Sequence, residues 1–282
     1  MNFFLPAILA FILTVILLPV STRLAKKYGL VDNPELRPHP AHIQNRIVPR
    51  AGGLAPYLSI VTISLLFLPL QKHIIGLILA LTILLFIGLA DDRLKNFSPY
   101  LRLGLQFLAA VVVVLSGVGI SFITNPFGGL IRLDSITWQV NFFGLHNIIV
   151  LADLLALFWI VWVMNMLNWS KGVDGQMPGI VTISAFIIGL LSLKLFLLGD
   201  PNQADIATLS FITAGASAGL LIFNWYPAKI FPGFSGSTIF GLTIATLAIL
   251  SGAKLATAGL VLLIPATDFV YTVLRRIFSG KS

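Results

Sequence analysis

Long apolar runs separated by short polar loops make up almost the whole of this sequence. Each run approaches the ~20 residues that an α-helix needs to cross the hydrocarbon core of a bilayer. The pattern therefore predicts an all-α, polytopic helical membrane protein with about nine to ten transmembrane helices. The runs lie at residues 2–20, 53–70, 74–90, 103–120, 147–167, 179–199, 206–223, 237–252 and 255–274.

The loops on the two sides of these runs differ in charge. Basic residues crowd the loops that follow odd-numbered runs, as at Arg23, Arg93 and the final Arg275-Arg276 pair, and are sparse in the others. Because Lys and Arg are retained on the cytoplasmic side, we expect the N-terminus outside and these loops inside. Among the outer loops, 121–146 is long, and its Gly-Gly pair and flanking alternation predict a small hairpin or an interfacial patch.

Composition excludes several classes of protein. Of the 282 residues, 57% are hydrophobic and 10% are charged, whereas soluble domains carry about 25% charged residues. An ordinary soluble enzyme, a disordered tail and a collagen-like fibre are therefore excluded. The chain has no cysteine, so it has no disulfide framework and no thiolate metal site. In a membrane protein the net charge of +8 indicates loop orientation and anionic lipids, with no nucleic acid as partner.

Polar residues collect in the expected cytoplasmic loops 21–52, 91–102, 165–179 and 224–238. Loops on a rigid scaffold usually carry the chemistry. No fixed-period repeat and no linker is visible in the sequence. We therefore interpret residues 1–282 as a single polytopic membrane domain whose cytoplasmic loops form the active face.

The first two of these loops carry charged groups suited to phosphate or metal. Arg37, Arg46 and Arg50 are candidate forks for oxyanions, or belong to a solvated basic loop near anionic headgroups. Asp91 and Asp92 follow the third run directly. Adjacent carboxylates near hydrocarbon are tolerated when they are solvated, ion-paired or neutralised by a divalent cation.

The third and fourth loops carry amides and a glycine-rich run. Asn165 and Asn168 share a helix face at the end of the fifth run, where they either cap the helix or bind a ligand. The run Gly-Phe-Ser-Gly-Ser at 233–237 either aims backbone N–H groups at an anion or forms a turn in which Ser237 caps the next helix.

Taken in order, these loops resemble the polyprenyl-phosphate N-acetylhexosamine-1-phosphate transferases, the family that includes phospho-MurNAc-pentapeptide translocase. The resemblance covers about residues 20–280. The matching pieces are Asp32-x-Pro34…Arg37 with Pro49-Arg50-x-Gly52-Gly53, Gly88-Leu89-Ala90-Asp91-Asp92, Asn165-x-x-Asn168 with Gly172-x-Asp174-Gly175, and Asn224…Pro227-Ala228-Lys229-x-Phe231-x-Gly233-x-Ser235-Gly236-Ser237.

The resemblance implies phosphoryl transfer at the inner face of a bacterial-type plasma membrane, the first membrane step of cell-envelope glycan synthesis. A polyprenyl phosphate oxygen would attack the β-phosphorus of a UDP-sugar, and UMP would leave. Such transfer needs positioning and charge neutralisation, which Mg²⁺ normally helps to supply. The partners implied are the lipid phosphate, the UDP-sugar and membrane lipids, with a homodimer as one assembly state.

The resemblance also implies roles for individual residues. The catalytic group is Asp91, Asp92, Asn168 and Asp174, of which Asp91, Asp92 and Asp174 are the expected Mg²⁺ ligands. The expected substrate-binding residues are Arg37, His39, Arg50, Arg102, Asn224, Lys229, Ser235 and Ser237. Lys171 is added to them because of its charge, as a departure from the family pattern and not as a match to it.

Two positions depart from the family pattern. Lys171 and Phe234 stand where that pattern has Asp, which makes the site about three charges more positive and disfavours a divalent ion there. Lys171 is then a candidate to grip a diphosphate as a point charge. The family's His-rich loop begins where this chain stops at Ser282, so we expect that C-terminal segment to be missing.

Two other functions remain open from the sequence. The missing carboxylates are compatible with a non-catalytic family member that binds polyprenyl phosphate or a nucleotide-sugar. A transporter or flippase is the second, because Asp153, Lys194 and Asp268 lie within apolar runs. That reading lacks the matched pair of broken helices typical of inverted-repeat transporters.

Overall fold

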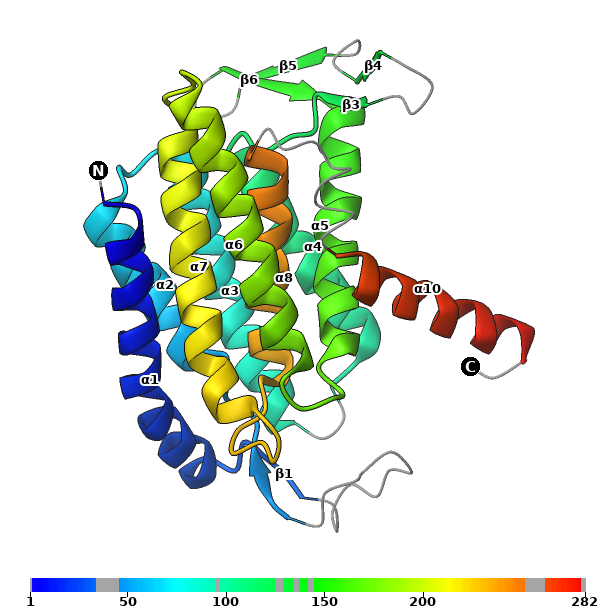
Figure 1. Ribbon diagram of the computed structural model, residues 1–282. Helices are drawn as coiled ribbons and strands as arrows, with labels where there is room; N and C mark the ends of the chain where they lie inside the picture. Colours follow the sequence, from blue (N-terminus) through cyan, green and yellow to red (C-terminus); the bar gives the residue numbers. More distant parts are fainter. Residues whose placement is uncertain are drawn as a thin grey trace.

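A computed structural model describes residues 2–33, 46–94, 97–124, 129–133, 137–141, 145–251 and 262–279. Figure 1 shows its long helices running side by side in one bundle. The helices are α1 (Phe4–Lys27), α2 (Leu54–Phe67), α3 (Lys72–Arg93), α4 (Pro99–Leu115), α5 (Val150–Ser170), α6 (Gln176–Leu197), α7 (Gln203–Asn224), α8 (Gly233–Leu250) and α10 (Leu263–Phe278).

By length and composition, six described helices can cross a membrane: α1, α3, α5, α6, α7 and α8. The helices α2 and α4 are also apolar but shorter. The run at 53–70 stops being helical at Leu68, directly before Pro69, because the residue before a proline is driven out of the helical region. The expected all-α membrane architecture is present, while the nine to ten full spans are not reached within the described residues.

The last expected run, 255–274, is described only from Leu262 onward. Its described part belongs to α10, which leaves the bundle at a steep angle (Figure 1). Val270 and Tyr271 are exposed on this helix, and Arg275 and Arg276 occupy its last turn. Exposed apolar side chains with a basic end suit a lipid surface better than the interior of a bundle.

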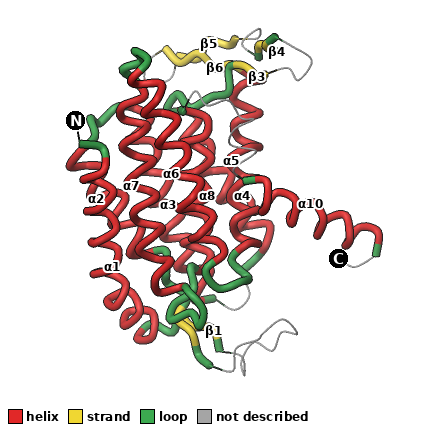
Figure 2. The backbone as a smooth tube through the Cα atoms, viewed as in Figure 1, coloured by secondary structure: helices red, strands yellow, loops and turns green. Residues whose placement is uncertain are grey.

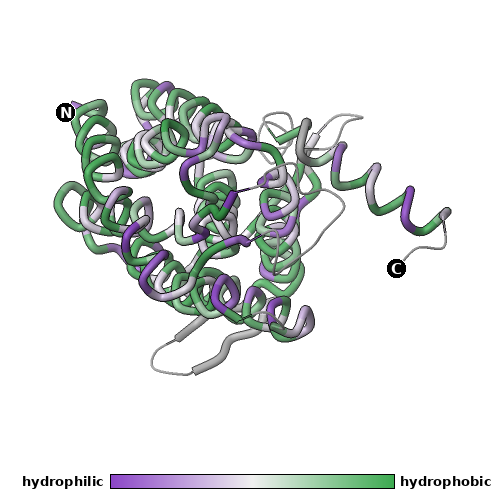
Figure 3. The backbone as a smooth tube through the Cα atoms, turned by 90° about the horizontal axis from the view of Figure 1, so that it is seen from below, coloured by the Kyte–Doolittle hydropathy of each residue, from purple (hydrophilic) through white to green (hydrophobic). Residues whose placement is uncertain are grey.

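The helices consist mostly of hydrophobic residues, which are green in Figure 3, and many large apolar side chains on them are exposed. On α1, for example, Leu5, Ile8, Ile12 and Ile16 are all exposed large side chains. Water would make such a continuous surface unfavourable, whereas hydrocarbon does not. The bundle therefore presents the surface of a membrane protein.

The helix α8 forms the centre, packing against α2, α3, α4, α5, α6 and α7. Several of its buried hydroxyls are satisfied within the helix: Thr238 and Thr243 donate to the carbonyls of Phe234 and Ile239, four residues earlier. This keeps polar atoms paired where no water reaches them. A central helix of this kind fixes the position of whatever lies at its ends.

Short strands lie at both ends of the bundle (Figure 2). At one end β1 (Val31–Asp32) pairs with β2 (Val48–Pro49). At the other, β3 (Phe122–Thr124) pairs with β4 (Leu130–Arg132), and β5 (Thr137–Asn141) with β6 (Leu145–Ile149). The expected hairpin in 121–146 is confirmed as two hairpins, and the second one delays the helix expected from 147 until Val150.

Candidate active site

The site is built around the N-terminus of α8, at the end of the bundle that carries β1. The first N–H groups of a helix have no partner within it. Here the carboxylate of Asp92 accepts from the N–H of Phe234 (2.9 Å) and of Ser235 (3.3 Å), and from the Ser235 hydroxyl (3.1 Å). Asp92 is fully buried. A carboxylate from α3 thus caps α8, which satisfies its free donors and favours its dipole.

This cap explains why α8 begins at Gly233, four residues earlier than the apolar run predicts. The interpretation of Ser237 as the helix cap is wrong, because its hydroxyl lies within hydrogen-bond distance (3.1 Å) of the Gly233 carbonyl inside the helix. A capping residue contributed by another helix leaves no local signature in the sequence, so the pattern could not reveal it.

Two glycines allow this close approach of α3 and α8. A Cβ on Gly88 would collide with the backbone and side chain of Ser235. Gly233 has a φ of +71°, and a Cβ there would collide with the Arg50 carbonyl and the Asp92 carboxylate. Only glycine fits the conformation and the space at Gly233.

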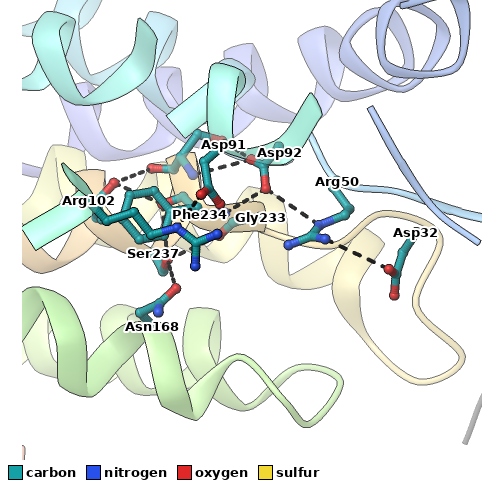
Figure 4. A network of polar contacts seen from close by, with 11 residues as sticks. Asp32, Arg50, Asp91, Asp92, Arg102, Asn168, Gly233, Phe234 and Ser237 are labelled. Carbon is teal, nitrogen blue, oxygen red and sulfur yellow. Dashed lines mark hydrogen bonds and ion pairs between the residues drawn. The ribbon is translucent and has the colours of Figure 1, made fainter. Parts of the chain in front are cut away.

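The first and fourth loops are joined through their backbones. Phe231 N–H donates to the Pro49 carbonyl at 2.7 Å, and Gly52 N–H donates to the Phe231 carbonyl at 3.0 Å. This places Arg50 beside Asp92, with 3.5 Å between Nε and Oδ1, while its Nη1 lies 3.8 Å from Asp32 (Figure 4). Arg50 therefore links two carboxylates at the rim of the site.

Asp91, the neighbour of Asp92, points to a different partner. It forms an ion pair with Arg102 of α4 (Figure 4), and it is 4% exposed against 34% for Arg102. The Arg102 guanidinium carbon lies 5.7 Å from the centroid of the Phe234 ring, and the Lys171 ammonium lies at the same distance from that centroid. Lys171 and Phe234, the two residues that depart from the family pattern, are thus neighbours in the structure.

Lys171 follows the last residue of α5 and sits among charges of both signs. Burial lowers the pKa of its ammonium to about 8. Asp92 and Asp91 oppose that shift, whereas Arg50 and Arg102 add to it. An ammonium in this setting carries a charge that the folded protein does not fully compensate, which favours an anionic ligand.

Amide side chains line the α5 side of the site. The Asn168 carbonyl oxygen lies 3.0 Å from the Ser237 hydroxyl, which binds α5 to α8. Asn165 donates to Gln106 of α4 at 2.9 Å and to the Val161 carbonyl at 2.8 Å. Asn165 therefore joins α5 to α4, and Asn168 joins α5 to α8.

The third and fourth loops are fastened to each other by two expected site residues. The Asn224 side chain accepts from Gly175 N–H (3.0 Å) and donates to the Ile230 carbonyl (2.9 Å). The Asp174 carboxylate accepts from Ala228 N–H at 2.9 Å. The Lys229 side chain is exposed. Contact of these three residues with a substrate stays a prediction.

A divalent metal ion does not fit the described residues. They contain no group of three or more His, Asp or Glu side chains placed to hold one. Of the three expected ligands, Asp91 is paired with Arg102, Asp92 with the start of α8 and Arg50, and Asp174 with Ala228. Mg²⁺ needs several oxygen ligands in near-octahedral geometry, and cations occupy the neighbourhood instead.

The structure brings most of the expected residues to one end of the bundle. Arg37 and His39 lie outside the described residues. Three contributors were not expected as site residues: Asp32, Gln106 and Phe234. The sequence held a signal for each of them. Asp32 belongs to the first-loop motif, and Phe234 replaces the Asp of the fourth-loop motif. Gln106 is a polar residue within an apolar run.

Comparison with known proteins gives a consistent result. The model of the family described as "Glycosyl transferase family 4" matches residues 74–252. The chain is 27% identical over 98% of its length to a Bacillus subtilis protein named "Probable undecaprenyl-phosphate N-acetylglucosaminyl 1-phosphate transferase", and covers 72% of that relative.

Two further relatives carry related names. The chain is 31% identical over 92% of its length to "Decaprenyl-phosphate N-acetylglucosaminephosphotransferase" of Mycolicibacterium smegmatis, covering 66% of it. It is 28% identical over 86% of its length to "Phospho-N-acetylmuramoyl-pentapeptide-transferase" of Streptococcus agalactiae, covering 71% of it. The chain thus spans about two thirds to three quarters of the length of these relatives.

Proposed function

Because this chain belongs to glycosyl transferase family 4, we propose that it transfers a sugar 1-phosphate from a UDP-sugar to a polyprenyl phosphate. The sugar is an N-acetylhexosamine, as in the names of the relatives, and the products are UMP and a lipid diphospho-sugar. The enzyme is a membrane transferase of cell-envelope glycan synthesis. The observation that carries this function is the meeting of Arg50, Arg102 and Lys171 around the start of α8.

The reaction is a single displacement at phosphorus. A new P–O bond forms between a lipid phosphate oxygen and the β-phosphorus of the donor, and the bond from that phosphorus to the oxygen of UMP breaks. The lipid phosphate and UDP-sugar together carry the same charge as the products, so no net proton is exchanged. Catalysis then consists mainly of positioning the phosphates and stabilising their negative charge.

The charged residues support a division of roles. Lys171 and Arg102 are placed to contact phosphate oxygens of the donor, with Asn168 beside them for the nucleotide or sugar. Asp91 holds Arg102 in position, and Asp92 with Ser235 holds the start of α8. Arg50, at the rim, is placed to receive the lipid phosphate as its tail remains in the bilayer.

The orientation of the protein follows from charge. The end of the bundle that carries the site also carries Arg23, Lys26 and Lys27 at the end of α1 and Arg93 at the end of α3. By the positive-inside rule this end faces the cytoplasm and the N-terminus lies outside, in a bacterial-type plasma membrane. Assembly as a homodimer stays a prediction, which the mass of the detergent-solubilised protein would test.

A product assay tests the function. Purified protein in detergent is given UDP-N-acetylglucosamine labelled in the sugar, with and without undecaprenyl phosphate. We expect labelled lipid diphospho-sugar and UMP in equal amounts, and neither without the lipid. Tight binding of the donor with no UMP would instead support the non-catalytic, substrate-binding alternative, and a donor with another N-acetylhexosamine would identify the sugar.

A further inference from the structure

One aromatic ring holds two cations at the centre of the site. Phe234 is 2% exposed, and both the Lys171 ammonium and the Arg102 guanidinium carbon lie 5.7 Å from its centroid. The face of an aromatic ring attracts cations, and more strongly where water is excluded. Unlike a carboxylate, the ring does not neutralise them. We name Lys171, Phe234 and Arg102 the cation–ring cluster.

The three cations around this cluster are paired unevenly, because Arg50 takes two of the three nearby carboxylates, Asp32 and Asp92. On α3, Asp91 pairs with Arg102 and Asp92 pairs with Arg50. Within the part of the chain that the structure describes, Lys171 forms no ion pair. A partly buried ammonium that lacks a direct counter-ion is costly to the fold unless a ligand supplies one.

The start of α8 cannot supply the anion site by itself. Helix N-termini often bind phosphate through their free N–H groups, but those of Phe234 and Ser235 already donate to Asp92. These two N–H groups are therefore not available to an anion, and the nearby cationic side chains are the remaining donors considered for it. An ammonium acts as a compact point charge and a guanidinium as a fork, a combination that suits two adjoining phosphate groups.

We propose that the cation–ring cluster binds the diphosphate of the sugar donor directly and that the donor site needs no divalent metal ion. This inference rests on the proposed function, which supplies the nucleoside diphosphate as ligand. The Lys171 ammonium then provides the charge that a bound metal would otherwise provide. Phe234 keeps the ammonium and guanidinium in place and occupies the space in which a further carboxylate would attract a metal.

Calorimetric titration of the full chain in detergent with UDP tests the proposal. We expect binding that is unchanged by excess EDTA or by added Mg²⁺, and a loss of about tenfold or more in Lys171→Gln, because a charge-assisted contact to phosphate is removed. Lys194→Gln, an exposed lysine on α6, is the matched control and should bind UDP normally. Binding that disappears in EDTA, or that Lys171→Gln leaves intact, would overturn the proposal.

A second variant tests the proposal by introducing carboxylates that should create a metal site. Combining Lys171→Asp with Phe234→Asp places two more carboxylates beside Asp91, which creates the oxygen-rich environment that divalent ions prefer. In Mn²⁺ electron paramagnetic resonance we expect no tight binding to the wild-type chain and tight binding to this variant. Its UDP binding should also become Mn²⁺-dependent. Tight Mn²⁺ binding by the wild-type chain, or metal-independent UDP binding by the folded double variant, would contradict the proposal.

Two outcomes distinguish a failure of the transfer reaction from a failure of the metal-free donor site. Binding of UDP in EDTA with no lipid product in the transfer assay would refute the proposed function and leave the metal-free donor site standing. Lipid product that forms only when Mg²⁺ is present would refute the metal-free site and leave the transfer reaction standing.

Discussion

The start of α8 lies between two polar regions that balance their charges differently. On the Asp92 side, a buried carboxylate accepts three hydrogen bonds from Phe234 and Ser235 and pairs with Arg50. On the Lys171 side, an ammonium and a guanidinium share one ring, and the ammonium has no ion pair among the described residues. The first region is satisfied by the protein and holds its loops together; the second is completed by an anion.

The largest expected effect comes from removing the satisfied carboxylate. Asp92→Ala leaves two N–H groups of α8 without their partner and Arg50 with Asp32 alone, so we expect the folded state to lose about 3–5 kcal/mol, as for other broken buried pairs. Thermal unfolding of the detergent-solubilised protein measures this loss. Asp91→Ala is the control, since its partner Arg102 is partly exposed. An Asp92→Ala protein as stable as Asp91→Ala would remove the distinction between the two regions.

Removing Lys171, which forms no ion pair among the described residues, should lower the activity and not the stability. We expect Lys171→Ala to lower the turnover of sugar-phosphate transfer by about 10²–10³-fold, the range for losing one charge stabiliser in a transition state. Its thermal stability should be equal to or higher than that of the wild type, because a desolvated ammonium has been removed. Normal turnover, or unfolding at a markedly lower temperature, would mean that Lys171 serves the fold.

A smaller loss is expected from crowding α3 against α8. Gly88→Ala inserts a methyl group into the Ser235 backbone, and we expect a destabilisation of about 1–3 kcal/mol, typical of overpacking. Gly104→Ala provides the control, because nothing lies within 4 Å of a Cβ there. Thermal unfolding compares the two variants, and equal stabilities would show that α3 and α8 are not in tight contact.

The smallest effect is a pH dependence. Burial and the flanking Arg50 and Arg102 hold the pKa of Lys171 at about 8, against the pull of Asp92 and Asp91. The ammonium therefore loses its charge as pH rises through 8, and UDP binding should weaken there. Because this folded-state pKa lies below the ordinary 10.5, the unliganded fold gains stability between pH 8 and 10.5.

Substitution by arginine isolates this titration. Lys171→Arg keeps its charge over the whole range, so its UDP affinity should not fall between pH 7 and 9. A wild-type affinity that stays constant over the same range would show that the Lys171 charge is not used.

Much of the fold could be predicted from the sequence because lipid demands long apolar helices. The bundle follows from the apolar runs, and a hairpin within 121–146 was one of the two structures expected from the Gly-Gly pair and the flanking alternation, whereas the second hairpin, β5–β6, was not expected. The start of α8 could not be predicted in this way, since its cap is Asp92, which lies far away in the sequence. The helix α2 is shorter than the apolar run 53–70 because Pro69 ends it, and hydropathy alone does not take this effect of proline into account.

The site shows a similar division. Its residue types and its loops were visible as motifs, and the structure gathers Asp91, Asn168 and Ser235 at one end of the bundle, as the motif order leads one to expect. From the sequence, Asp91 and Asp92 were expected to share one role, because two adjacent residues of the same type give no indication of which partner each one faces. Only the packing of α4 and α8 sends one carboxylate to Arg102 and the other to Ser235.

The most direct measurement is the rate of lipid diphospho-sugar formation by the wild-type chain as free Mg²⁺ is varied from none, in excess EDTA, to millimolar concentrations. A site that neutralises the donor diphosphate with Lys171 and Arg102 predicts product at the same rate throughout. A rate that is zero in EDTA and saturates with added Mg²⁺ would contradict this account.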